Sequence, residues 1–257
     1  MSSSQDVFAK QDPETHVLQV RIERGPHNFF DFDTLSAVAD ALEAGAKNGA
    51  RAAVLSSDGK NFCAGADFSG STGSLRGDGT RHVYDVATRL FAQQIPIVAA
   101  VQGAAIGGGL GLALVADFRV ASPESRFSAN FSLLGFHHGF ALSETLPWVI
   151  GNQRSAELLY TGQRLNGRQA FDIGLCDYLV SADMIEAKAT DLAEEIAKSA
   201  PLAVQSIRHT MRAPLNRNIE AALARERSEQ ERLQQTEDFR EGLKAVSERR
   251  VANFVGR

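Results

Sequence analysis

Two glycine-containing segments could together bind an oxyanion. The first is Asn61–Asp67 (NFCAGAD), after the apolar run Ala52–Leu55. The second is Gly103–Asp117 (GAAIGGGLGLALVAD), after the apolar run Ile97–Val101, and it continues into a helix of small residues. Small residues at the end of a strand let backbone N–H groups approach a ligand closely, and a helix N-terminus adds partial positive charge. Two such N–H groups from separate loops can stabilise one developing oxyanion.

Common alternative motifs are absent from the sequence. The run Gly107–Gly111 lacks the third glycine of a dinucleotide-binding fingerprint and the lysine of a phosphate-binding P-loop. No GxSxG serine elbow and no HExxH zinc motif occurs, so neither a serine hydrolase nor a zinc protease is indicated. Taken alone, a glycine-rich turn before an apolar helix indicates tight packing. Cys63, beside the first loop, is interpreted as a small packing residue.

Both loops at this spacing resemble the enoyl-CoA hydratase/isomerase superfamily, also called the crotonase superfamily. The motifs FCAGAD and GAAIGGGLGLALVADFRVAS carry the resemblance, and Leu158–Leu179 and Glu248–Phe254 extend it over nearly the whole chain. In that family one N–H from each loop holds the thioester oxygen of an acyl-CoA. The resemblance implies that the donors here are Ala66 and Gly108. Coenzyme A is then part of the substrate, no cofactor is bound tightly and no metal is needed. The implied contacts to it come from Arg24, Ala64, Asp67, Phe68 and Phe254.

Both catalytic glutamates of the family's hydratases are replaced. Their positions correspond to Gly111 and Phe131, and neither side chain can transfer a proton. We therefore do not expect standard hydration. An isomerase needs only one base, but the downstream family acid falls near Gly139. The nearest titratable groups make Glu144 the preferred acid/base and His138 the second candidate.

Other side chains are open to two interpretations. His82, Tyr84 and Asp85 begin a predicted helix, and we favour a solvent-facing helix start over a catalytic role for them. Several phenylalanines are either ordinary core or the wall of an acyl tunnel, where they would suit an apolar or aromatic acyl group. They are Phe29, Phe30, Phe32, Phe68, Phe131, Phe136 and Phe140.

The elements that position these residues alternate between strands and helices, which predicts an α/β fold. Strands are expected over 16–22, 52–57, 97–101 and 118–121, and helices over 34–48, capped by Asp33, and 82–93. The resemblance adds a crotonase-like spiral of repeated ββα units. Residues 1–13 are predicted to be a mobile leader, 14–198 the spiral core and 199–257 a C-terminal helical region. This region includes a charged, solvent-facing helix over 218–244, and in relatives it mediates oligomerisation.

Composition sets the remaining expectations. The chain has 257 residues, of which 44% are hydrophobic, so a single large core is available. With 27 basic and 31 acidic residues the net charge is −4, which leaves no basic surplus for nucleic acid. Two cysteines are too few for a disulfide scaffold, and no apolar run is long enough for a membrane helix. We expect a cytoplasmic protein without a nucleic-acid or membrane partner. The family resemblance implies that it forms a homotrimer or a dimer of trimers.

The sequence therefore predicts an acyl-CoA enzyme that stabilises a thioester enolate between two N–H groups. Its reaction class is expected to be that of the enoyl-CoA hydratase/isomerase family, as a lyase or isomerase. Two alternatives stay open: a decarboxylase with a non-standard acid/base, and a catalytically silent protein that only binds acyl-CoA.

Overall fold

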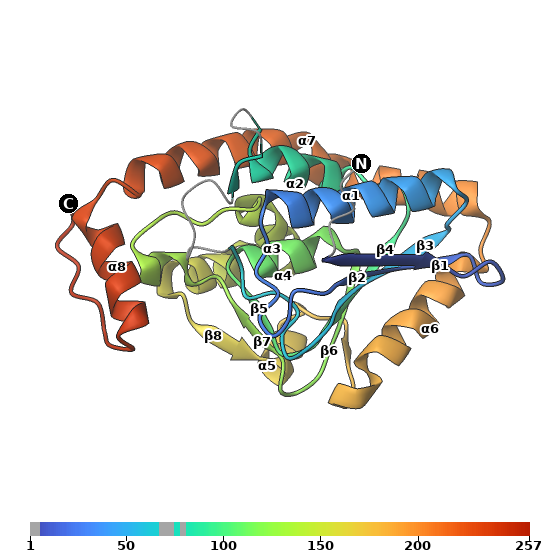
Figure 1. The fold of residues 1–257 in the computed structure, drawn as a ribbon, viewed down its shortest axis with the longest axis horizontal. Helices are drawn as coiled ribbons and strands as arrows, with labels where there is room; N and C mark the ends of the chain where they lie inside the picture. Colours follow the sequence, from blue (N-terminus) through green and yellow to red (C-terminus); the bar gives the residue numbers. More distant parts are fainter. Residues whose placement is uncertain (1–5, 67–74, 78–80) are drawn as a thin grey trace.

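A computed structural model describes residues 6–66, 75–77 and 81–257, and its largest element is a six-stranded sheet (Figure 1). The strand order is β1-β2-β3-β4-β6-β9, antiparallel between β1 and β2 and parallel elsewhere. The strands span Val7–Gln11 (β1), Val17–Ile22 (β2), Ala52–Ser57 (β3), Ile97–Val101 (β4), Phe118–Ala121 (β6) and Tyr178–Leu179 (β9). Where a mobile leader was predicted over residues 1–13, the segment from Val7 to Gln11 instead pairs along the length of β2.

A second, three-stranded sheet gives the fold its spiral. It contains β5 (Ala104–Ile106), β7 (Arg126–Ser128) and β8 (Arg164–Asn166), and Cys63 forms a parallel bridge to Ala105 of β5. The chain thus passes from β3 to the bridge at Cys63, from β4 to β5 and from β6 to β7, and each time a helical segment follows. This repeated strand–strand–helix passage confirms the predicted crotonase-like spiral.

Helices cover both faces of the large sheet, and the central strands β3 and β4 are buried along their whole length for that reason. Val54 of β3 and Val98 of β4 face helix α6 (Ile185–Ala197), whereas Leu55 and Ala99 belong to the core on the opposite face. That core also contains the apolar sides of α1 (Phe32–Lys47), α2 (Val83–Phe91) and α3 (Gly108–Val115). The two glycine loops lie between β3 and α2 and between β4 and α3, so the sheet and these helices hold them.

The first helix begins earlier than predicted. Asp31, not Asp33, is its N-cap, and the Asp31 carboxylate accepts a hydrogen bond of 2.8 Å from the Thr34 N–H. Asp33 lies inside the first turn, exposed.

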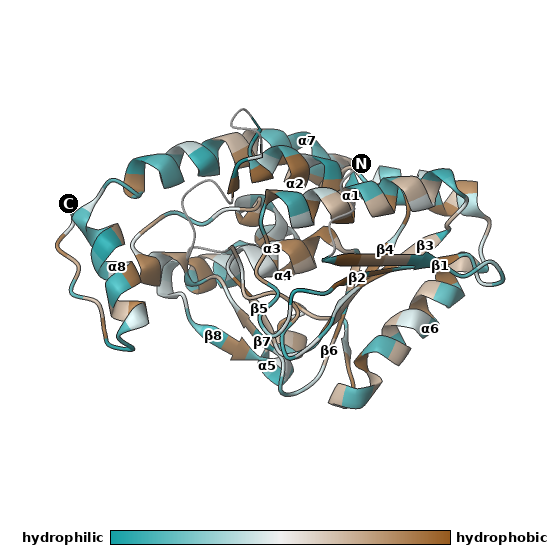
Figure 2. Cartoon of the chain, viewed as in Figure 1, coloured by the Kyte–Doolittle hydropathy of each residue, from teal (hydrophilic) through white to brown (hydrophobic). Residues whose placement is uncertain are grey.

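The C-terminal region differs from the predicted single charged helix over 218–244. Helix α7 (Pro201–Leu233) runs continuously through Pro214, and a separate helix α8 (Glu237–Ser247) begins at the Thr236 cap. In Figure 2 hydrophilic residues recur along α7. Several side chains of this helix are nevertheless buried, among them Arg208, Arg212 and Glu226. The remaining helices are η2 (Asn130–Leu134), α4 (Leu142–Thr161), α5 (Gly167–Asp172) and η3 (Ala182–Met184). Among the described residues, no helix combines the length and the apolar character needed to cross a membrane.

Candidate active site

Both glycine loops line one cavity of about 530 Å³. Ala64–Ala66 of the first loop and Ile106–Gly108 of the second contribute to its wall. Helices α2, α7 and α8 close it from other sides, so segments distant in the sequence meet around one space. The structure thus brings together the two segments that the sequence paired.

The loops approach each other because the second one has glycines at two demanding positions. Gly107 has φ +57°, a backbone conformation that L side chains rarely adopt. A Cβ built on Gly109 would lie 2.1 Å from the Cys63 carbonyl oxygen, so only glycine permits this close approach of the second loop to the first. Backbone hydrogen bonds link the loops, with Ile106 N–H donating to the Cys63 carbonyl at 3.1 Å. Burial raises the pKa of the Cys63 thiol to about 12, as suits a packing residue.

The N–H groups of Ala66 and Gly108 are available as donors. Within the described part of the chain, neither N–H donates to another backbone group. A Cβ built on Gly65 would lie 3.8 Å from the Gly108 nitrogen, which shows how close the loops are. Gly108 is also the first residue of α3, where the aligned peptide dipoles favour negative charge. The arrangement can stabilise an oxyanion that develops inside the cavity.

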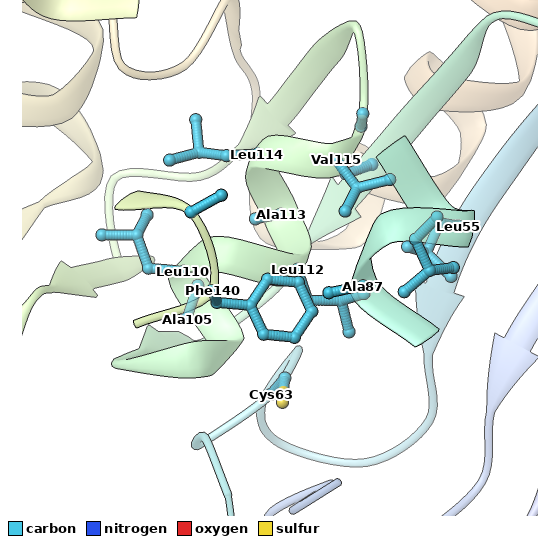
Figure 3. Close-up of a cluster of buried hydrophobic side chains, with 14 of the residues drawn as sticks. Leu55, Cys63, Ala87, Ala105, Leu110, Leu112, Ala113, Leu114, Val115 and Phe140 are labelled. Carbon is cyan, nitrogen blue, oxygen red and sulfur yellow. The ribbon is translucent and has the colours of Figure 1, made fainter. Parts of the chain in front are cut away.

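An aromatic ring fills the space beside Gly111, the first replaced glutamate position. A Cβ on Gly111 would lie 2.5 Å from Cβ of Phe140 and 2.7 Å from its ring, so no larger side chain fits there without displacing Phe140. Figure 3 shows this ring against α3, between Cys63 and the apolar residues of the helix. At the second replaced position Phe131 lines the cavity, with its ring centroid 5.4 Å from that of Phe136.

The two preferred acid/base candidates lie outside the cavity wall. Glu144 accepts a hydrogen bond of 3.1 Å from the amide of Asn218 on α7 and is not among the described lining residues. The Nε2 atom of His138 is buried without a hydrogen-bond partner in the described structure, and burial lowers the pKa of this histidine to about 4. Phe140 and Ala141 both have positive φ, so the chain turns sharply between the two side chains. Phe140 lines the cavity, whereas Glu144 is not among the described lining residues.

Tyr84 and Gln230 supply polar groups to the cavity wall. Tyr84 is only 9% exposed, and its hydroxyl donates to Gln230 Oε1 at 2.8 Å, while Gln230 Nε2 donates to the His137 carbonyl at 3.0 Å. A Cβ on Gly139 would lie 1.8 Å from the Tyr84 oxygen. The absence of a side chain at Gly139 therefore makes room for this hydroxyl.

His82 also lines the cavity, as the N-cap of α2. Its Nδ1 accepts a hydrogen bond of 3.2 Å from the Tyr84 N–H, which assigns the proton of the neutral ring to Nε2. Burial lowers the pKa of His82 to about 4, so the ring is neutral at pH 7. The solvent-facing helix start that we favoured for His82 and Tyr84 was wrong, because α7 packs across this end of α2.

Glu226 and Gln230 on α7 were missed by the sequence analysis. Glu226 is 1% exposed and accepts hydrogen bonds from the Ala141 N–H at 2.7 Å, the Ser143 N–H at 2.9 Å and the Ser143 hydroxyl at 2.6 Å. Burial raises its pKa to about 7. The only sequence signal was a spacing of one helical turn between the two residues. Together they hold the segment that carries Phe140.

The residues expected to contact coenzyme A are only partly at the cavity. Ala64 lines it. Arg24 pairs with Asp31 at 2.8 Å and donates to the Phe29 carbonyl at 3.0 Å, so it supports the segment that brings Phe29 to the wall. Phe254 is 40% exposed in the C-terminal segment and is not among the described lining residues. Asp67 and Phe68 lie outside the described residues.

Comparison with known proteins gives one consistent result. The family described as Enoyl-CoA hydratase/isomerase matches residues 12–257. A probable enoyl-CoA hydratase of Bacillus subtilis (strain 168) is 31% identical over 97% of this chain and 95% of its own length. A crotonyl-CoA hydratase of Syntrophomonas wolfei is 30% identical over 90% of each chain. The crystal structure of an enoyl-CoA hydratase/isomerase from Pseudoalteromonas atlantica superposes with a TM-score of 0.88, at 27% identity, over 98% of this chain and 100% of its own.

Proposed function

The chain belongs to the enoyl-CoA hydratase/isomerase family, and we therefore propose that it binds an acyl-CoA in the cavity and stabilises its thioester enolate. The proposal rests on one observation: Ala66 and Gly108 line the same cavity, beside the N-terminus of α3. An enolate oxygen between these donors would gain most where charge develops, which is how such sites accelerate proton removal from the α-carbon.

The polar side chains of the wall do not favour fast addition of water. Tyr84 keeps its proton at neutral pH because burial raises its pKa, and neutral His82 presents an N–H. These groups donate hydrogen bonds, whereas a hydratase needs a carboxylate that activates water. We propose that Tyr84 contacts the acyl group, in preference to Glu144 and His138.

The proposal is tested by deuterium exchange at the α-carbon of bound acyl-CoAs. Gly108→Pro removes one donor, and proline is tolerated at the first residue of a helix. Gly108→Ala is the matched control, because both variants carry the Cβ that would meet the Phe30 ring and only proline lacks the N–H. We expect exchange to be about 100-fold slower in the proline variant than in the alanine variant. Equal rates would contradict the proposed oxyanion site.

The same exchange measurement compares the side chains considered for a role at the acyl group. Tyr84→Phe should slow exchange, whereas Glu144→Gln and His138→Ala should leave it within about threefold of wild type, because neither residue reaches the described wall. If Glu144→Gln or His138→Ala abolishes exchange while Tyr84→Phe does not, the assignment to Tyr84 is wrong.

A catalytically silent acyl-CoA-binding protein is the second candidate. One observation favours it: aromatic rings occupy both positions where the family's hydratases place carboxylates. Titration calorimetry separates the two candidates when combined with the exchange experiment. Tight binding of acyl-CoAs with no exchange for any of them identifies the silent protein.

A further inference from the structure

Aromatic rings bound the part of the cavity nearest to the second-loop donor. A Cβ built on Gly108 would lie 2.6 Å from the ring of Phe30 and 3.8 Å from that of Phe140, and one built on Gly107 would lie 3.6 Å from the ring of Phe131. Two of these phenylalanines are adjacent in space to the residue whose N–H would hold the thioester oxygen. An acyl group whose thioester oxygen meets this N–H would extend from the thioester between aromatic rings.

The rings are held in place before any ligand arrives. Phe30 and Phe140 have centroids 5.5 Å apart with planes tilted by 60°, and Phe136 packs against Phe131 at 5.4 Å and Phe239 at 5.1 Å. These spacings and tilts are the ones that ring quadrupoles favour. A wall fixed in this way loses little conformational entropy when another ring packs on it.

Among the described residues, the wall also lacks a charged partner for an acyl group that ends in a carboxylate. The described lining residues include no Lys, Arg, Asp or Glu, and His82 is neutral at pH 7. By sequence, residues 67–74 and 78–80 contain no Lys, Arg or His either. A carboxylate taken into this cavity would lose its hydration and find no cation, which is strongly unfavourable.

From these observations we propose that the natural acyl group is uncharged and carries an aromatic ring close to the thioester. The ring would pack among Phe30, Phe131 and Phe140 while the carbonyl oxygen meets the Ala66 and Gly108 N–H groups. This inference rests on the proposed acyl-CoA function and adds the class of substrate to it.

Titration calorimetry with four thioesters tests the inference. Phenylacetyl-, octanoyl- and adipyl-CoA have acyl groups with the same number of heavy atoms but differ in ring and charge, and acetyl-CoA reports on the coenzyme A portion. We expect the Kd of phenylacetyl-CoA to be about threefold to tenfold below that of octanoyl-CoA and at least about tenfold below that of adipyl-CoA. If octanoyl- or adipyl-CoA binds as tightly as phenylacetyl-CoA or more tightly, the inference about the acyl group is wrong, but the proposed function stands. Failure of all four to bind overturns the proposed function as well.

A matched pair of variants locates the effect. Phe131→Leu removes a ring from the wall, whereas Phe239→Leu makes the same change in a residue that also contacts Phe136 but is not among the lining residues. Phe131→Leu should weaken phenylacetyl-CoA binding about threefold to tenfold and octanoyl-CoA binding by less than about twofold. Phe239→Leu should change the affinity for neither thioester. A parallel loss for both ligands in Phe131→Leu would show general damage to the site and contradict ring-specific recognition.

Discussion

Glu226 is a buried carboxyl group that links the fold to the wall of the cavity. Its three hydrogen bonds reach the backbone of Ala141 and the backbone and hydroxyl of Ser143. Phe140, whose ring lies beside Gly111 and Gly108, directly precedes this anchored segment. A polar residue on a distant helix therefore fixes an apolar group at the site.

The raised pKa of Glu226 predicts a pH-dependent stability. Between its ordinary pKa of 4.5 and the folded value of about 7, the folded chain binds more protons at this group than the unfolded chain does. Its contribution to the free energy of unfolding is therefore complete below about pH 4.5 and falls as the pH rises to about 7, by at most on the order of 3 kcal/mol. Glu226→Gln should abolish this fall.

The measurement is urea unfolding of wild type and Glu226→Gln at several pH values. His138 faces Glu226 at 3.7 Å, and its pKa, lowered to about 4, makes stability rise with pH over an overlapping window. Glu144 and Tyr84 also lie within electrostatic reach of Glu226. The difference between the two proteins isolates Glu226, because the other groups are common to both. A difference that does not vary between pH 4.5 and 7 would contradict the raised pKa.

At the scale of elements, the start of α1 connects helix formation to the cavity. Asp31 caps the helix through Thr34 and pairs with Arg24, which in turn holds the Phe29 carbonyl. Asp31→Ala should lower the free energy of unfolding by about 1–2 kcal/mol, because it removes both the cap and the ion pair. Asp33→Ala, an exposed change two residues later, should cost less than about 0.5 kcal/mol.

Denaturant unfolding of the two variants decides the point. Asp31→Asn serves as a third protein, since an asparagine keeps the cap and loses the ion pair, and it should recover most of the loss. If Asp33→Ala is the more damaging change, then the helix begins where the sequence analysis placed it.

Local sequence revealed some residues of the site and not others. The meeting of the two loops at one cavity was predictable, because the glycines that allow their close approach are local in the sequence. The donor roles of Ala66 and Gly108 stay predictions. Tyr84 was assigned to a solvent-facing turn, because nothing near it in the sequence reveals that α7 covers it. Glu226 was hidden among many charged residues in α7, where one inward-facing side chain does not disturb the polar pattern.

At the scale of the whole molecule, the outer surface predicts self-association. Ile207 and Met211 are one helical turn apart on α7 and are 63% and 65% exposed, and Trp148 on α4 is also half exposed. Exposed apolar side chains in such numbers are typical of surfaces that another chain covers. We propose the homotrimer or dimer of trimers that the family resemblance implies.

Light scattering coupled to size exclusion should give a mass of three or six chains for wild type. Ile207→Glu combined with Met211→Glu should shift the protein towards the mass of one chain, whereas Ala187→Glu, an exposed change on α6, should not. A monomeric wild type would contradict the proposal, as would a double variant that retains the wild-type mass.

The cavity cannot be completed early in the synthesis of the chain. Its wall joins Ala64–Ala66 to Leu243, Val246 and Ser247 of α8, which lie far apart in the sequence. On the ribosome the first loop emerges early, but the nascent chain cannot close the cavity until α8 has left the exit tunnel. A ligand of this cavity therefore meets a complete wall only once α8 has emerged, and the elements of the spiral that precede α8 are synthesised before the site can bind it.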